Sequence, residues 1–265
     1  MVERFFHSNG LRLRYLDGGD GDTIVLVHGF AQDADRWVKT GTFARLAARY
    51  RVLALDCRGH GRSDKPHDPT QYGDMDADVV HMLDDAAVRR AHFVGYSMGG
   101  ALVGRMLVRH HEYVVTATLV GATGLASTTG AANRARMADE FERGEAHSLV
   151  LAVRPTNEGA PDDAQVREAS AKVLAGNDPL ALAALLRAPI VPIVAADLAV
   201  ASETAAMLGV AGTADPALHA LLELKKTVPR LHVVAIEGAG HAATLSRPEL
   251  VDAIEQFLSS SVRHW

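Results

Sequence analysis

His92-Phe93-Val94-Gly95-Tyr96-Ser97-Met98-Gly99 is a short apolar run that leads directly into the helix-like segment 100–109. Gly95 to Gly99 fit the pattern G-x-S-x-G, which places a serine on a sharp turn between a strand and a helix. Small residues are needed on either side because the turn is strained and passes close to neighbouring chain. The pattern predicts that Ser97 is a nucleophile whose hydroxyl is exposed at the tip of the turn.

Short apolar runs that suit strands recur on both sides of this turn. Runs of this kind are typical of strands buried on both faces of a parallel sheet. They lie at 23–27, 52–55, 92–94, 114–120, 207–211 and 232–236. Asn9-Gly10 between two further runs, 2–8 and 11–16, predicts an antiparallel hairpin at the start of the chain. Helical spacing between the runs, at 75–86, 100–109 and 216–226, predicts an α/β sheet with right-handed crossovers.

The alternation of strands and helices stops after Gly121 and returns near residue 201. The interval holds helix-like stretches at 133–153 and 164–174 and a further helix that Asp178 and Pro179 open. An insertion of this length is long enough to act as a lid. We therefore expect a core formed by residues 1–121 and 201–265, with a helical cap over residues 122–200.

Ser97 needs a base, because a serine hydroxyl is a weak nucleophile near neutral pH and histidine is the usual activator. Of the 13 histidines, His241 follows a predicted strand and ends the glycine-rich loop 237–241. The order serine, acid, histidine along the chain is the order that this strand–turn–helix arrangement uses. His241 is therefore the predicted base.

Asp215 is the predicted acid that orients His241. It follows the run 207–211, at the carboxyl end of a predicted strand, where sites gather in open α/β sheets. Asp197 is the alternative, but Pro192 makes the stretch before it a poor central strand. A second interpretation of Asp215 is a plain helix-capping residue.

Two backbone N–H groups are expected to form an oxyanion hole. Met98 supplies one at the start of the helix after Ser97, and Phe30 supplies the other in the loop after the run 23–27. His28, in the same loop, is interpreted as a structural residue whose side chain hydrogen-bonds and stiffens it.

These motifs resemble those of the α/β-hydrolase superfamily, in the branch with a helical cap that includes small esterases, enol-lactonases and carbon–carbon bond hydrolases. The matching segments are 26–30, 56–64, 95–99, 212–215 and 240–241. The resemblance implies a mostly parallel eight-stranded sheet flanked by helices, with the cap inserted after the sixth strand. It also implies that 56–64 is a structural turn in which Cys57 is a buried, inert thiol.

The activity that the resemblance implies is acyl transfer. Ser97 attacks a carbonyl, an acyl-enzyme forms, and water activated by His241 hydrolyses it, with no metal or organic cofactor. The Ala, Leu and Val content of the cap favours a small, mostly apolar substrate. We therefore expect a carboxylesterase-like enzyme that cleaves a carboxylic ester or a lactone.

Other activities of the family remain as alternatives. Serine at the nucleophile position argues against the epoxide hydrolases and haloalkane dehalogenases, which use aspartate. Carbon–carbon hydrolases often carry Trp after the catalytic histidine, where this chain has Ala242, so cleavage of a vinylogous diketone is the second hypothesis. Non-hydrolytic members (perhydrolases, cofactor-free oxygenases, lyases) and a ligand-binding module are further hypotheses. Arg187 is either a ligand for a substrate carboxylate or, as we prefer, a solvated helix-end residue.

Composition narrows the choice of partners. The 265 residues are 48% hydrophobic and 22% charged with a formal net charge of −5 and no basic run, which argues against nucleic acid. The lone Cys57 excludes an internal disulfide. Without a signal-peptide pattern or an apolar run near ~18 residues, the chain is expected to be cytoplasmic and soluble. A monomer or weak homodimer is expected, since no heptad pattern stands out.

Overall fold

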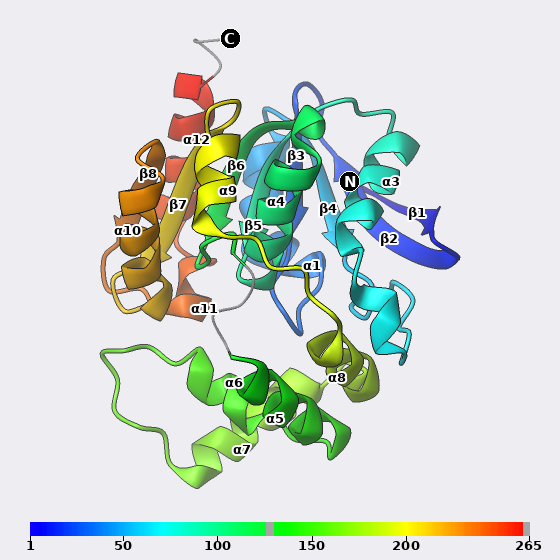
Figure 1. Cartoon of the computed structure of the whole chain (residues 1–265), viewed down its shortest axis with the longest axis vertical. Helices are drawn as coiled ribbons and strands as arrows, with labels where there is room; N and C mark the ends of the chain where they lie inside the picture. Colours follow the sequence, from blue (N-terminus) through cyan, green and yellow to red (C-terminus); the bar gives the residue numbers. More distant parts are fainter. Residues whose placement is uncertain (126–129, 262–265) are drawn as a thin grey trace.

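The computed structural model describes residues 1–125 and 130–261, and its eight strands form one sheet with helices on both faces (Figure 1). The strand order is β1-β2-β4-β3-β5-β6-β7-β8, with β1 and β2 antiparallel to their neighbours and every other pair parallel. The strands are β1 Val2–Ser8, β2 Leu11–Gly18, β3 Thr23–Val27, β4 Arg51–Asp56, β5 Ala91–Tyr96, β6 Val114–Val120, β7 Ala206–Gly212 and β8 Leu231–Ile236. This confirms the mostly parallel, eight-stranded sheet predicted above.

Helices pack on the sheet because successive strand side chains point to opposite faces. In β3, Val25 and Val27 join the core under α3 and α4, whereas Ile24 and Leu26 join the core under α2 and α12. The sheet-side helices are α1 Asp35–Lys39, α2 Thr42–Ala47, α3 Met75–Asp85, α4 Met98–Arg109, α9 Ala195–Ala201, α10 Pro216–Thr227, α11 His241–Thr244 and α12 Pro248–Ser261, with 3₁₀ turns η1 Pro69–Tyr72 and η2 His111–Tyr113. None of the described helices combines the length and the apolar character needed to cross a bilayer.

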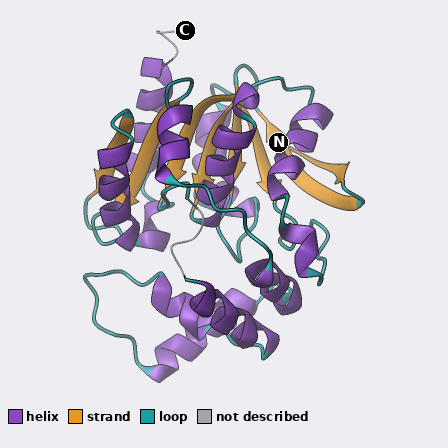
Figure 2. Ribbon diagram, viewed as in Figure 1, coloured by secondary structure: helices purple, strands orange, loops and turns teal. Residues whose placement is uncertain are grey.

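Four helices between β6 and β7 form a separate layer below the sheet (Figures 1 and 2). They are α5 Ala131–Glu142, α6 His147–Ala152, α7 Asp163–Leu174 and α8 Pro179–Arg187. This layer has a small apolar core of its own, formed by Ala138, Phe141, Ala146, Leu182 and Ala183. The described residues between 122 and 200 form no strand, as the sequence predicts.

The fifth helix of this interval, α9, belongs spatially to the sheet. It packs against α4 and α10, and Leu198 is fully buried in the core on that face. Residues 190–194 form no strand, and Asp197 accepts a hydrogen bond from the Val194 N–H (3.0 Å) at the start of α9. Asp197 therefore contacts the N-terminal turn of α9.

Candidate active site

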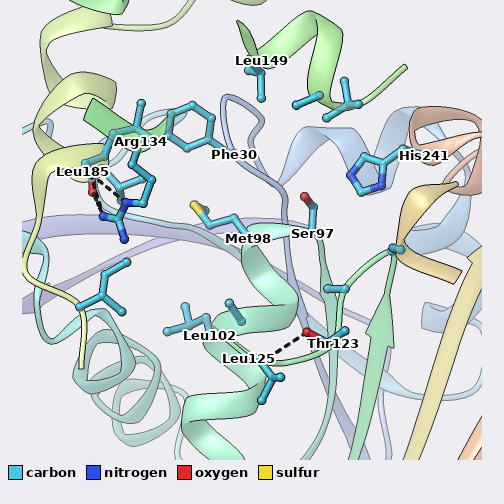
Figure 3. Close-up of a pocket in the computed structure, with 18 of the residues that line it drawn as sticks. Phe30, Ser97, Met98, Leu102, Thr123, Leu125, Arg134, Leu149, Leu185 and His241 are labelled. Carbon is cyan, nitrogen blue, oxygen red and sulfur yellow. Dashed lines mark hydrogen bonds between the residues drawn. The ribbon is translucent and has the colours of Figure 1, made fainter. Parts of the chain in front are cut away.

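Ser97 occupies the turn between β5 and α4 in a backbone conformation that few residues other than glycine adopt, with φ +52° and ψ −113°. Its N–H donates to the carbonyl of Val120 in the neighbouring strand β6 (2.9 Å). A Cβ on Gly95 would collide with the carbonyl of Gly99, and a Cβ on Gly99 would collide with that of Val27. Glycine is thus a steric requirement on both sides of Ser97, whose hydroxyl points into the pocket (Figure 3).

His241 and Asp215 form a buried pair. His241 Nδ1 lies 2.9 Å from Asp215 Oδ2, and because an ionised carboxylate only accepts hydrogen bonds, Nδ1 carries the proton. In the neutral imidazole, Nε2 is then the nitrogen that can accept a proton. The other carboxylate oxygen, Oδ1, accepts a hydrogen bond from the Ala217 N–H (2.9 Å) at the start of α10. One oxygen of Asp215 therefore caps a helix while the other contacts the imidazole.

Two residues that the sequence does not single out enclose this pair. The Tyr96 hydroxyl donates to the carbonyl of His241 (3.2 Å), and the two rings lie 4.9 Å apart between centroids. A Cβ on Gly121, whose φ is +59°, would lie 2.9 Å from His241 Cε1 and 3.1 Å from Asp215 Oδ2. The one sequence signal for this close approach of the Gly121 backbone to His241 and Asp215 is a glycine directly after the predicted strand 114–120.

Ser97 and His241 face the same cavity from different elements (Figure 3). Among the described residues, no hydrogen bond joins the Ser97 hydroxyl to the imidazole or to any other group. Hydrogen bonds between a nucleophile and its base are often long without substrate and shorten when it binds. The predicted nucleophile and base thus line one cavity, and no hydrogen bond between their side chains is formed in the described part of the chain.

The loop after β3 carries Phe30, which lines the cavity, and His28, which fixes the loop. His28 Nε2 accepts a hydrogen bond from the Cys57 N–H (3.0 Å), so its Nδ1 carries the proton and donates to the carbonyl of Gly29 (2.7 Å). Burial lowers the pKa of His28, which keeps the ring neutral. The structural interpretation of His28 is confirmed.

Residues 56–64 have the structural character that the resemblance implies. Asp56 is fully buried and accepts hydrogen bonds from the N–H groups of Ala34 (2.7 Å) and Arg62 (2.8 Å) and from Arg14 (3.0 Å). Burial raises the pKa of the Cys57 thiol, so the thiol stays protonated and unreactive. This turn contacts the loop after β3 through the Cys57–His28 hydrogen bond and through His60, which packs on Phe30.

The cavity has a volume of about 390 Å³, within the range of small-molecule sites. The five predicted site residues, Phe30, Ser97, Met98, Asp215 and His241, all line it.

Arg187 does not line the cavity. It pairs with Asp139 (2.6 Å) and Glu142 (2.9 Å), so the helix-end interpretation is confirmed. Arg105 and Arg134 line the cavity instead, and the sequence does not predict either. In the described part of the chain, no three His, Cys, Asp or Glu side chains form a metal-binding group.

Comparisons with known proteins place the chain in a family. The alpha/beta hydrolase family model matches residues 24–254. The acetoin-cleaving-system dihydrolipoyllysine-residue acetyltransferase component of Cupriavidus necator is 34% identical over 46% of this chain and 32% of that protein. The 2-hydroxy-6-oxo-6-(2'-aminophenyl)hexa-2,4-dienoic acid hydrolase of Metapseudomonas resinovorans is 33% identical over 62% of this chain and 57% of that protein. The chain therefore matches less than two thirds of the length of these curated relatives.

A solved structure extends the likeness over the whole chain. A thermophilic esterase from Thermogutta terrifontis superposes with a TM-score of 0.77 at 22% identity, covering 98% of this chain and 99% of the esterase. Identity at this level establishes a shared fold and leaves the substrate open. The family match spans the parallel strands from β3 to β8 apart from Thr23, together with every predicted site residue, and the chain belongs to the alpha/beta hydrolase family.

Proposed function

We propose that this protein is a serine hydrolase that cleaves a carboxylic ester or lactone of a small, mostly apolar substrate through an acyl-enzyme on Ser97. The observation that carries the proposal is the strained φ of +52° at Ser97, held beside a cavity that the buried His241–Asp215 pair also lines. Backbone strain at a single residue persists where the surrounding structure enforces it, as at a nucleophile.

The proposed reaction begins when His241 Nε2 removes the proton of the Ser97 hydroxyl and Ser97 Oγ attacks the substrate carbonyl. The resulting oxyanion accepts hydrogen bonds from the N–H groups of Phe30 and Met98, each contributing about 3 kcal/mol in comparable sites. His241 then protonates the leaving alcohol. Water, deprotonated in turn by His241, attacks the acyl-enzyme and releases the acid, which restores Ser97.

We also propose that α5–α8 act as the cap of this site. Met137, Leu149 and Leu185, from three of these helices, line the same cavity as Ser97. Phe30 of the core packs edge-to-face on Phe141 of the cap, with centroids 5.5 Å apart. Because α9 packs on the sheet, the proposed cap ends with α8 rather than at residue 200.

Cleavage of a carbon–carbon bond is the second candidate function. It is favoured by the 33% identity to the Metapseudomonas resinovorans dienoic acid hydrolase. The same nucleophile and base would serve, and the substrate would be a vinylogous diketone rather than an ester. Loss of the diketone's visible absorbance in the presence of the protein is the expected result for this candidate.

The experiment that tests the ester proposal is hydrolysis of p-nitrophenyl esters from acetate to laurate by the wild type, Ser97→Ala and Ser246→Ala. Ser246 is exposed and outside the cavity, so Ser246→Ala controls for the loss of a serine hydroxyl. We expect the wild type and Ser246→Ala to turn over at least one ester and Ser97→Ala to fall to background. Equal turnover by Ser97→Ala, or turnover of no ester in the series by any of the three, refutes cleavage of simple neutral esters on Ser97.

A further inference from the structure

Two arginines line the cavity without a carboxylate partner. Arg105 comes from α4 and Arg134 from α5, and both line the cavity that Ser97 faces. Within the described ranges, neither guanidinium forms an ion pair with an Asp or Glu. The segment 126–129, Ala-Ser-Thr-Thr, contains no acidic residue. Both arginines are half-buried, and cations taken out of water are usually paired.

The partners that these arginines do have are neutral carbonyl groups. Arg134 Nε and Nη2 donate to the carbonyl of Leu186 (3.0 and 2.7 Å), and Nη2 also donates to that of Ala188 (3.2 Å). Arg105 Nη1 makes one long bond to the carbonyl of Gly73 (3.5 Å). Neither side chain has a nitrogen that is both buried and unpartnered, so their remaining N–H groups face accessible space.

The two guanidinium charges repel one another, and no carboxylate among the described residues pairs with either of them. Burial lowers the pKa of Arg105, and burial and the charge of Arg105 both lower the pKa of Arg134. A guanidinium nevertheless stays protonated in proteins. Asp76 attracts Arg105 from a distance, but its carboxylate is paired with Arg109 (3.0 Å) and His110 (3.1 Å). An anion bound between the two guanidinium groups would relieve this repulsion.

Helix geometry places the Arg105 guanidinium at the end of the apolar, cavity-lining face of α4 that is far from Met98. Met98, Ala101, Leu102 and Arg105 are spaced i, i+3, i+4, i+7, so they share one face of α4, and all four line the cavity. Arg105 therefore lies about 10 Å further along the helix axis than Met98, at about 1.5 Å per residue. Arg134 lies on the opposite side of Met98 from Ser97 and His241 (Figure 3).

We propose that Arg105 and Arg134 bind a carboxylate at the far end of the substrate's apolar chain, so that the preferred esters carry a free acid group. The planar guanidinium fork matches a carboxylate, and Met98, Ala101 and Leu102 line the path for the apolar chain between the acid and the scissile carbonyl. This specificity rests on the proposed ester cleavage at Ser97.

The test compares each acid ester with its neutral methyl-capped counterpart. One arm uses mono-p-nitrophenyl esters of succinate, adipate, suberate and sebacate, which carry the acid on the acyl side. The other arm uses O-acetyl ω-hydroxy acids, which carry it on the alcohol side. The ratio of kcat/KM between the acid and its counterpart is measured for the wild type, Arg105→Gln and Arg136→Gln. Arg136 is exposed on α5 and lies outside the cavity, so Arg136→Gln removes one positive charge, as Arg105→Gln does, without changing the cavity lining.

We expect the wild type to prefer the acid member in one arm, with an optimum at one chain length. Arg105→Gln should lower that preference roughly tenfold to hundredfold, the loss expected for a charged hydrogen bond, and Arg136→Gln should keep it. Arg134→Gln also removes the bonds to α8, so Arg105→Gln carries the test. Ser97-dependent turnover with no preference in either arm, or a preference that Arg105→Gln keeps, overturns the anion site and leaves ester cleavage standing.

A binding measurement tests the arginines without turnover. Succinate, adipate, suberate and sebacate are each titrated calorimetrically into Ser97→Ala and into the double variant Ser97→Ala/Arg105→Gln. We expect binding to Ser97→Ala and a dissociation constant at least about tenfold weaker in the double variant. Equal affinities, or no binding to Ser97→Ala at any dicarboxylate length, overturn the proposal even if the protein proves to cleave something other than esters.

Discussion

Asp215 serves two groups with its two carboxylate oxygens, and substitution can separate them. In Asp215→Asn the amide oxygen can still accept from the Ala217 N–H, but the amide nitrogen facing His241 Nδ1 cannot accept its proton. The imidazole would then lose its orientation and tautomer, which in comparable triads lowers kcat by about 10⁴. We expect a loss of that order in ester hydrolysis, with a thermal midpoint close to that of the wild type.

Asp215→Ala is the matched comparison, because it removes both contacts. It should lose activity to a similar extent and lose about 1 kcal/mol more stability, the usual value of a helix N-cap. Thermal unfolding of the two variants beside the p-nitrophenyl ester assay separates the effects. Activity of Asp215→Asn within tenfold of the wild type would show that Asp215 is only a helix cap.

Residues with a role in a local motif could be predicted, and residues whose role comes from a distant contact could not. Ser97 is marked by its flanking glycines, and His241 and Asp215 by the strands before them. Tyr96 contacts His241 across 145 positions of sequence, and no local pattern encodes that contact. Arg105 and Arg134 lie in ordinary helices, and only the fold brings α4 and α5 to the same cavity.

At the scale of elements, the inner strands could be predicted because each is an apolar run buried on both faces of the sheet, whereas the edge strands β1 and β8 are only partly buried. The run 23–27 is β3 itself, and 114–120 is β6. The helices α1, α2 and α9 were not predicted, because they have five, six and seven residues and show no clear helical period. The extent of the proposed cap depends on α9, which packs on the sheet side through the buried Leu198.

The carboxyl end of β6 gives the element-scale prediction. Gly121 follows this strand with φ +59°, and a Cβ there would press on His241 Cε1 and Asp215 Oδ2. Gly121→Ala should therefore displace the imidazole and strain the backbone by about 1–2 kcal/mol. We expect kcat in the ester assay to fall at least about tenfold, since small misplacements of catalytic groups are costly.

Gly159→Ala is the control for this substitution, because a Cβ at Gly159 meets nothing within 4 Å and its φ is not in the left-handed region. It should keep both the wild-type rate and the wild-type unfolding midpoint. If Gly121→Ala turned over esters as fast as Gly159→Ala, the turn after β6 would not constrain His241.

At the scale of the whole molecule, the buried histidines make stability depend on pH. His28, His60 and His92 are all buried, and burial lowers the pKa of each, that of His60 to about 3. His60 Nδ1 donates to the carbonyl of Arg58 (3.1 Å), while its Nε2 has no partner in the described part of the chain. The folded protein therefore holds these rings neutral where the unfolded chain protonates them.

Proton linkage determines whether the free energy of unfolding rises or falls with pH. In the unfolded chain a histidine has a pKa near 6.5, which is above its pKa in the folded protein. The stability that each neutral, buried histidine contributes is therefore fully present above about pH 6.5, and it is lost as the pH falls toward the folded pKa. The slope is about 1.4 kcal/mol per pH unit for each histidine. Between pH 7 and pH 5, His60 alone should remove about 2 kcal/mol from the free energy of unfolding.

Urea unfolding at pH 7 and pH 5 tests this on the wild type, His60→Gln and His219→Gln. Glutamine does not titrate, so the loss of stability between the two pH values should be about 2 kcal/mol smaller in His60→Gln than in the wild type. His219 is exposed on α10, and His219→Gln should behave as the wild type does. The comparison uses the difference between pH values within each variant, so a general destabilisation by His60→Gln cancels. An equal loss in all three proteins would mean that His60 is protonated in the folded state, against the burial that lowers its pKa.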